Sequence, residues 1–150
     1  MKLSEMIKSE NIILAFDAKN KTEAIGALVG PVVNGFDKAK LVESILEREK
    51  LGSTGVGHGV AVPHVRIDEV TSPAVVFGRS STPVDFNSID DMPCTLFFLV
   101  LGATNQESQD IYLKTMAKIS RLMRDAGVRD ALKAAVDSAA VIAAISGGEG

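Results

Sequence analysis

The sequence has no tryptophan, and only one tyrosine and one cysteine among its 150 residues. Six phenylalanines are its other aromatic residues, so it offers little of the aromatic surface on which nucleic-acid bases stack. Its 16 basic and 19 acidic residues give a net charge of −3, whereas nucleic-acid-binding domains usually carry a basic face. These shortages argue against a nucleic-acid partner.

The single cysteine and the shortness of the apolar runs bear on the cellular compartment. Cys94 has no second cysteine for an internal disulfide, which is compatible with a reducing environment. Charged residues are scattered through residues 1–17, so this segment lacks the apolar core of a signal peptide. The longest solid apolar run, Leu96–Leu101, has six residues, against the roughly 20 that a membrane helix needs. We therefore expect a cytoplasmic protein without membrane insertion.

The apolar patterns predict strands interleaved with helices, and hence an α/β fold with helices packed on a central sheet. Strands are expected at Ile12–Phe16, Val60–Val62 (ending at Pro63), Pro73–Gly78 and Thr95–Leu101. Helices are expected after the caps Asn20, Asp37 and Thr104 (the last in a capping box with Glu107), and near Val128–Val136 and Ser138–Ile145. The simplest organisation is one domain over residues 1–150, with 147–150 as a frayed tail.

Two histidines, His58 and His64, are the main candidates for chemistry. His64 follows Pro63 at the end of a short apolar strand, where α/β folds present reactive groups to solvent. An imidazole has an ordinary pKa near 6.5, so at cytoplasmic pH it is largely neutral and nucleophilic. Position alone leaves open that His64 is a loop residue without a role.

Two other kinds of site fit the sequence poorly. In an extended chain, the six residues between His58 and His64 span about 20 Å, too far to share a metal ion, and there is no Cys/His cluster elsewhere. The glycines at 55, 57 and 59 precede a strand, whereas a nucleotide-binding loop joins a strand to a helix and ends in G-K-[ST]. We therefore expect neither a metal nor a cofactor.

Residues 48–64 form one continuous string: Arg48-Glu49, a glycine-rich turn that begins Gly52-Ser53-Thr54-Gly55, then Val60-Ala61-Val62-Pro63-His64. The string resembles the active-site signature of the fructose/mannitol-type enzyme IIA family of the bacterial phosphotransferase system. The Gly52–Gly55 variant looks most like the free-standing nitrogen-regulatory branch. Similarity extends through the turn at 86–93 and the helix around Tyr112, and covers roughly Leu3 to Ile145. It implies a central mixed sheet flanked by helices on both faces.

The resemblance also implies a reaction. His64 would accept a phosphoryl group from the phosphohistidine of an HPr-type carrier and pass it on, with an enzyme IIB or a regulated target as the next partner. Arg48 matches the family's active-site arginine, and its planar fork of donors suits phosphate oxygens. Without the motif, Arg48 would be interpreted as a solvated cation at the end of a helix.

The glycine-rich turn is expected to surround the reacting histidine. Thr54, Gly55, Gly57 and Gly59 would let the backbone approach closely around His64. His58, at the variable position of the motif, would lie on the rim of the site. The alternative for these residues is a tight turn that holds no ligand.

One position departs from the family pattern. Tyr112 aligns with the family's second active-site histidine, and a tyrosine hydroxyl stays neutral near pH 7. We expect Arg48, His64 and Tyr112 to converge, with the Tyr112 hydroxyl fixing the tautomer of His64. Two hypotheses remain: a phosphocarrier that transfers through His64, or a regulatory binding module that kept the fold without transferring.

Overall fold

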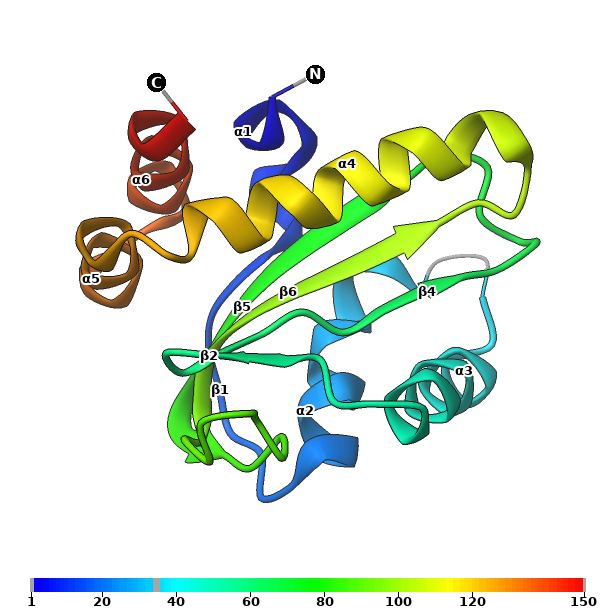
Figure 1. Cartoon of the computed structure of the whole chain (residues 1–150), viewed down its shortest axis with the longest axis horizontal. Coiled ribbons are helices and arrows are strands. Elements are labelled where there is room, and N and C mark those ends of the chain that lie inside the picture. The colour runs from blue at the N-terminus through cyan, green and yellow to red at the C-terminus, as the bar shows by residue number, and fades with distance from the viewer. Residues whose placement is uncertain (1, 34–35, 150) are drawn as a thin grey trace.

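A mixed β-sheet forms the middle layer of the protein (Figure 1). The computed structural model describes residues 2–33 and 36–149. The strands in these ranges are β1 (Ile12–Phe16), β2 (Gly55–Gly57), β3 (Val60–Ala61), β4 (His64–Arg66), β5 (Ala74–Val84) and β6 (Cys94–Gly102). β5 and β6 pair antiparallel at the centre, β1 lies parallel to β5, and β3 and β4 both lie parallel to β6. β2 pairs antiparallel with β3, which gives the order β1-β5-β6-β3-β2.

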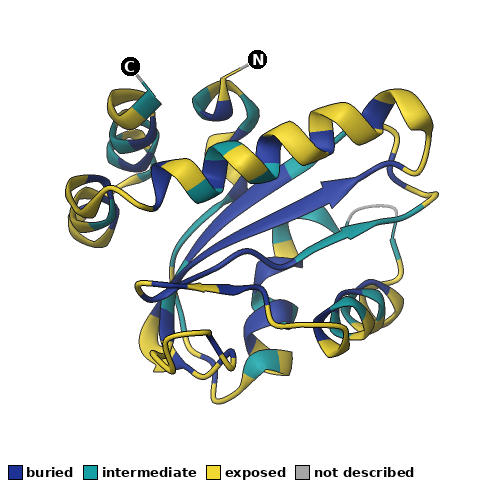
Figure 2. Ribbon diagram, viewed as in Figure 1, coloured by how far each residue is buried: buried dark blue, intermediate teal, exposed yellow. Residues whose placement is uncertain are grey.

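Helices cover both faces of the sheet (Figures 1 and 2). One face carries α2 (Lys21–Leu28) and α3 (Lys38–Lys50), and the other carries α1 (Leu3–Met6), α4 (Gln106–Leu122), α5 (Ala126–Ala134) and α6 (Ser138–Glu149). Two 3-10 turns lie at Ser9–Asn11 and Gly30–Val32. The expected α/β fold is confirmed. Within the described ranges, no helix is both long and apolar enough to cross a membrane.

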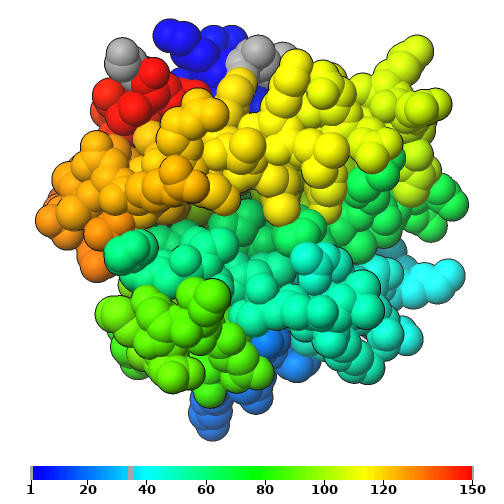
Figure 3. Space-filling model, in the orientation of Figure 1, coloured from blue at the N-terminus to red at the C-terminus, as the bar shows by residue number. Residues whose placement is uncertain are grey.

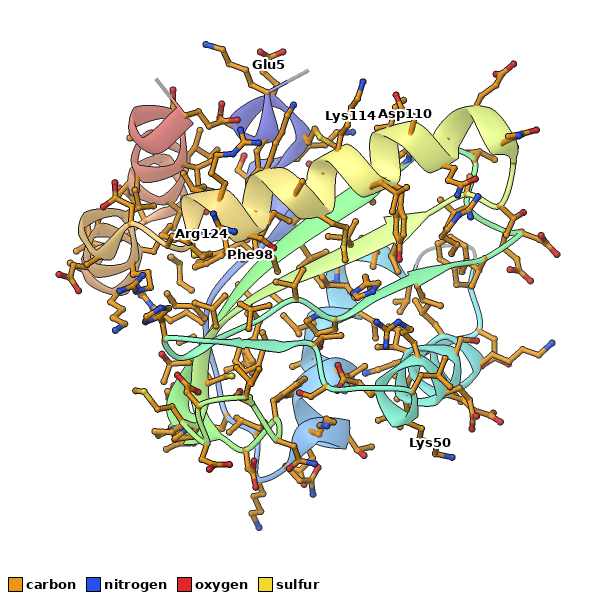
Figure 4. All side chains as sticks on the ribbon, in the orientation of Figure 1. Glu5, Lys50, Phe98, Asp110, Lys114 and Arg124 are labelled. Atoms are coloured by element: carbon orange, nitrogen blue, oxygen red, sulfur yellow. The ribbon has the colours of Figure 1, made fainter. Side chains whose placement is uncertain are left out.

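The apolar core has two halves, which meet at β6. Alternate residues of a strand point to opposite faces, so β6 contributes to both halves. Leu96, Phe98 and Val100 pack toward α4, α5 and α6, whereas Phe97, Leu99 and Leu101 pack toward α2 and α3. Figure 4 shows Phe98 beneath α4, with the Asp110–Lys114 ion pair on the outer surface of that helix. β6 is therefore buried on both faces, as its apolar sequence predicts.

Side-chain caps start α2, α3 and α4, and the cap of α4 differs from the sequence prediction. Asn20 Oδ1 accepts a hydrogen bond from the Glu23 amide, and Asp37 Oδ1 accepts one from the Lys40 amide, as expected. α4, however, is capped by Asn105, which accepts from the Ser108 amide. Thr104 is not the cap, because its hydroxyl donates to Asp68 instead.

The sequence predicts one strand that ends at Pro63, just before His64. In the structure, Pro63 lies between two strands. β3 stops at Ala61, and the chain pairs with β6 again from His64 onward. Proline has no amide proton to donate to the ladder, although its carbonyl still accepts from the Val100 amide at 3.0 Å. His64 therefore begins a strand, and does not follow the end of one.

The sequence predicts a frayed tail over 147–150, whereas in the structure α6 extends to Glu149. Residues 147–149 continue α6, and Gly150 lies outside the described residues. The Glu149 carboxylate accepts hydrogen bonds from the amides of Leu3 at 2.6 Å and Ser4 at 3.0 Å. These contacts bind the end of α6 to the start of α1, which composition alone could not indicate.

Candidate functional site

His64 lies at an edge of the sheet. It pairs with Val100 of β6, and β6 is the only strand in the described chain that pairs with β4. Its side chain is on the α4 side and is partly buried. In Figure 3, α4 (yellow) and the segment from β2 to β4 (green to cyan) lie side by side on one face of the molecule. The position gives His64 solvent access from a rigid element.

A backbone contact fixes the proton of the His64 ring. Nδ1 lies 2.8 Å from the carbonyl oxygen of Val62. Because a carbonyl oxygen can only accept, this hydrogen bond requires the proton on Nδ1. The neutral ring then carries its lone pair on Nε2. The tautomer is thus held by the main chain, and not by Tyr112 as the sequence suggests.

The surroundings of His64 favour its neutral form. Burial lowers the pKa of His64 from its ordinary value of 6.5, and the Arg48 guanidinium lowers it as well. The hydrogen bond to Val62 and the Glu49 carboxylate act in the opposite direction, without reversing the shift. A depressed pKa leaves Nε2 unprotonated at neutral pH.

Arg48 approaches from the other helical layer. It lies in the last turn of α3, is half-buried, and donates from one Nη atom to the carbonyl of Gly52 at 3.1 Å. Its charge acts on both His64 and Tyr112, which shows that the guanidinium lies within electrostatic range of both rings. Arg48 therefore acts on His64 through its charge.

Tyr112 contacts His64 through its ring. The two ring centroids lie 6.0 Å apart with the planes at 60°, an edge-to-face arrangement, and Tyr112 is only 7% exposed. Burial raises the pKa of Tyr112 to about 12, although the charges of Arg48 and Arg66 oppose this. Among the described residues no hydrogen bond joins Tyr112 to His64. Tyr112 and His64 therefore meet ring to ring and the charge of Arg48 acts on both, while the proposed hydroxyl contact is absent from the described residues.

Arg66 is a charged neighbour that the sequence reasoning missed. It lies two residues after His64 on β4, so both side chains are on the same face of the strand. Its guanidinium donates to the carbonyls of Ala103, Thr104 and Asn105, and its Cζ lies 5.9 Å from the centroid of the Tyr112 ring. Because side chains alternate between the two faces of a strand, the spacing of two residues from His64 was the signal in the sequence that could have identified Arg66.

The turn at Gly57 to Gly59 is distant from His64. Gly57, His58 and Gly59 have φ of 94°, 59° and 78° and connect β2 to β3, and the His58 amide donates to Asp90. Val60 pairs with Leu96 and His64 with Val100, so the turn lies more than four residues, or about 13 Å, away along β6. His58 is therefore not on the rim of the His64 site.

Gly55 and Thr54 lie farther from His64 along the chain than this turn does, and they contact other groups. A Cβ on Gly55 would overlap the side chain of Ser88, so this glycine permits close packing against the turn before β6. Thr54 is buried, and both its amide and its hydroxyl donate to Glu49. Neither residue presents a free donor to a ligand beside His64.

Glu49 is the second residue that sequence reasoning passed over, although it stands in the Arg48-Glu49 pair of the motif. Its side chain is buried, and Oε2 forms an ion pair with Lys21 Nζ at 3.0 Å. Lys21 belongs to α2, 28 residues earlier in the chain.

The family model described as phosphoenolpyruvate-dependent sugar phosphotransferase system, EIIA 2, matches residues 5–147. The chain belongs to this family. A nitrogen regulatory protein of Bradyrhizobium diazoefficiens is 32% identical to this enzyme IIA over 148 residues, which are 97% of this chain and 95% of that protein.

Solved structures of enzyme IIA proteins share the fold. The nitrogen regulatory protein IIA-Ntr of Neisseria meningitidis matches with a TM-score of 0.86 at 28% identity, covering 95% of this chain and 98% of that one. A chain in the complex of enzyme IIAMTL with phosphorylated enzyme IIBMTL from Escherichia coli matches with a TM-score of 0.78 at 26% identity, covering 94% and 97%. These matches confirm the enzyme IIA resemblance, including its likeness to nitrogen-regulatory members.

This enzyme IIA thus presents one unprotonated ring nitrogen at an accessible sheet edge, with the charge of Arg48 acting on it and Arg66 on the same face of the strand. Such a set can attack an electrophile and stabilise an anion. Within the described ranges, no three His, Cys, Asp or Glu side chains are grouped so that they could hold a metal ion.

Proposed function

We propose that His64 is the phosphoryl acceptor of this phosphotransferase-system carrier, and that it receives the group from the phosphohistidine of an HPr-type protein. The observation that carries the proposal is the hydrogen bond from Nδ1 to the Val62 carbonyl, which leaves the Nε2 lone pair free. In the transfer, a new bond forms between Nε2 and phosphorus while the phosphorus–nitrogen bond of the donor breaks. The donor imidazole leaves with that electron pair, and His64 keeps its proton on Nδ1.

Arg48 is the electrostatic partner in this proposal. Phosphoryl transfer passes through a loose transition state whose charge is spread over the oxygens, so the protein mainly positions and stabilises charge. The charge of Arg48 acts to lower the pKa of both His64 and Tyr112, which supports the placement of Arg48 beside the transferred group. One of its Nη atoms is bonded to the Gly52 carbonyl, which restrains the side chain at the end of α3.

Tyr112 would orient the acceptor ring without adding charge. Its pKa of about 12 keeps the hydroxyl protonated, so it can donate to a phosphate oxygen but cannot replace a histidine cation. The edge-to-face contact restricts rotation of the His64 ring on the α4 side.

A regulatory output is the second part of the proposal. The relatives in Bradyrhizobium and Neisseria are named nitrogen regulatory proteins, and the mannitol relative is seen with phosphorylated enzyme IIB. A phosphate on His64 would place a dianion at an exposed sheet edge, which changes protein docking through charge and desolvation. We propose a regulated target or an enzyme IIB as the recipient. The exchange would be cytoplasmic, since the buried Cys94 thiol suits a reducing compartment.

The test is transfer of labelled phosphate from a phosphorylated HPr-type carrier. We expect an acid-labile, base-stable adduct that is lost in His64→Ala. His58→Ala is the matched control, because His58 is the only other histidine and lies at the distant β2–β3 turn. Label that survives in His64→Ala and disappears in His58→Ala would overturn the proposal. A parent protein that never accepts label, yet binds the phosphorylated carrier, would favour the non-transferring binding module.

A further inference from the structure

A buried carboxylate lies beneath the His64 site. The side chain of Glu49 is only 3% exposed, although it projects from the same helical turn as the half-buried Arg48. Its two oxygens face different partners, with Oε2 on Lys21 Nζ and Oε1 on Thr54. Removing a carboxylate from water costs free energy, and an ion pair offsets this cost only when its geometry is good. Its burial therefore calls for a specific role.

Hydrogen bonds connect this carboxylate to His64 in three steps. The amide of Thr54 donates to Glu49 Oε1 at 3.1 Å, and the Thr54 hydroxyl donates to the same oxygen. The Thr54 carbonyl accepts from the Val62 amide at 2.9 Å. The Val62 carbonyl then accepts from His64 Nδ1 at 2.8 Å. Both donors of Thr54 are committed to Glu49, which fixes its backbone beside Val62.

We infer that Glu49 is a positioning residue for His64, which holds Thr54 and Val62 so that Nδ1 keeps its proton and Nε2 faces the donor. The segment it holds needs such an anchor. Val62 and Pro63 lie between β3 and β4, outside both ladders with β6, although the Pro63 carbonyl still accepts from the Val100 amide. The Val62 amide is instead bonded to Thr54, so the position of the Val62 carbonyl depends on that residue.

The charge of Glu49 adds a second effect on His64. Arg48 and Glu49 from α3 act on the ring through their charges, and Tyr112 from α4 contacts it. Arg66, two residues along β4, lies over the Tyr112 ring. Burial and Arg48 lower the pKa of His64, whereas Glu49 raises it. Glu49 thereby offsets part of the effect of Arg48 and keeps Nε2 more basic than the phosphate-binding cation alone would allow. This benefit for transfer rests on the proposed function, whereas the control of ring position does not.

The test is a nitrogen-resolved NMR titration of His64 in the full chain, which needs no phosphoryl donor. Glu49→Gln keeps the size of the side chain and removes the charge. Its control is Glu47→Gln, on the same helix, where the carboxylate is 62% exposed and pairs with Lys50. Figure 4 shows Lys50 pointing away from the body of the protein. His58→Ala assigns the two sets of ring signals.

We expect the parent and Glu47→Gln to show the Nδ1-protonated tautomer with the same titration midpoint. Glu49→Gln should show a mixture of tautomers and a lower midpoint, because the opposing charge of Arg48 remains. An unchanged tautomer and midpoint in Glu49→Gln would overturn the inference.

A double variant separates positioning from stability. Lys21→Met with Glu49→Gln removes both charges of the buried pair, and neutral replacement of such pairs often restores stability. We expect its free energy of unfolding to recover while the tautomer mixture remains. If the tautomer and midpoint also return to parental values, Glu49 only stabilises the fold. The proposed function would fail separately, through absence of label on a His64 whose titration follows these expectations.

Discussion

Replacing Gly102 with alanine should displace the Tyr112 ring from His64. Gly102 is the buried last residue of β6, directly beneath α4. A Cβ at this position would lie 3.0 Å from Cε1 and 3.1 Å from Cγ of Tyr112, and closer still to Cδ1. The missing side chain of Gly102 is therefore what allows the ring to lie against the sheet.

The size of the effect follows from contact distances. Non-bonded carbon atoms settle about 3.5–4.0 Å apart, so the distances to Cε1 and Cγ require a retreat of roughly 0.5–1 Å, and the closer Cδ1 requires more. Overpacking a buried site costs about 1–3 kcal/mol, and we expect Gly102→Ala to lower the free energy of unfolding by that amount. Loss of the edge-to-face contact should also slow phosphorylation of His64 several-fold.

Urea unfolding and the initial rate of phosphate labelling measure the two effects. Gly26→Ala is the control, because Gly26 lies within α2 with open space around it and should gain about 0.5–1 kcal/mol. In a Tyr112→Ala background, where the ring is absent, Gly102→Ala should cost little. The difference between the two backgrounds gives the coupling energy directly.

A Gly102→Ala protein as stable as the parent would contradict the reasoning about packing. If Gly102→Ala lowers the free energy of unfolding equally with and without the Tyr112 ring, a neighbour other than Tyr112 causes the loss of stability. Loss of stability without any change in labelling rate would show that the ring contact does not orient His64.

Three further predictions concern titration and capping. Burial and the charge of Arg48 lower the pKa of His64, so the NMR titration midpoint of this ring should lie below 6.5. The midpoint should rise in Arg48→Ala, and an unchanged midpoint would remove Arg48 from the site. Because this pKa is depressed on folding, the stability contributed by neutral His64 is present above about pH 6.5 and decreases as the pH falls through the folded value. Tyr112 is the only tyrosine, so tyrosinate absorbance should rise near pH 12 in the folded protein, and a midpoint near 10 would contradict its burial. Asn105→Ala should lower the free energy of unfolding by about 1 kcal/mol in urea and Thr104→Ala by less, and the reverse order would make Thr104 the cap of α4.

The capping positions show how far local rules extend. Asn20 and Asp37 act on amides three residues away, so the sequence near each helix start contains the whole interaction. At α4, Thr104 and Asn105 are both good caps by type. The contact that decides between them is with Asp68, 36 residues earlier, which only the fold brings near.

The site shows the same limit. Arg48 and His64 could be selected because one continuous motif contains them. Glu49 stands in the same motif, but its ion pair with Lys21 joins residues distant in sequence, as do the contacts of Arg66 with carbonyls after β6. Nearness in sequence also misled the prediction for His58. β3 carries the chain along β6 between the two histidines, so residues six apart in the sequence lie at different places on the sheet.

The hydrogen bonds between Glu149 and the start of α1 have a practical consequence for handling the protein. They bring the two ends of the described chain to one corner, formed by α1 and α6 (Figure 1). His64 is instead on β4, the strand that pairs with β6 beyond β3. Adjacent chain ends of this kind tolerate tethers and joining peptides. A surface anchor, a fluorescent partner or a ring-closing linker placed at that corner would therefore leave the sheet edge that carries His64 uncovered.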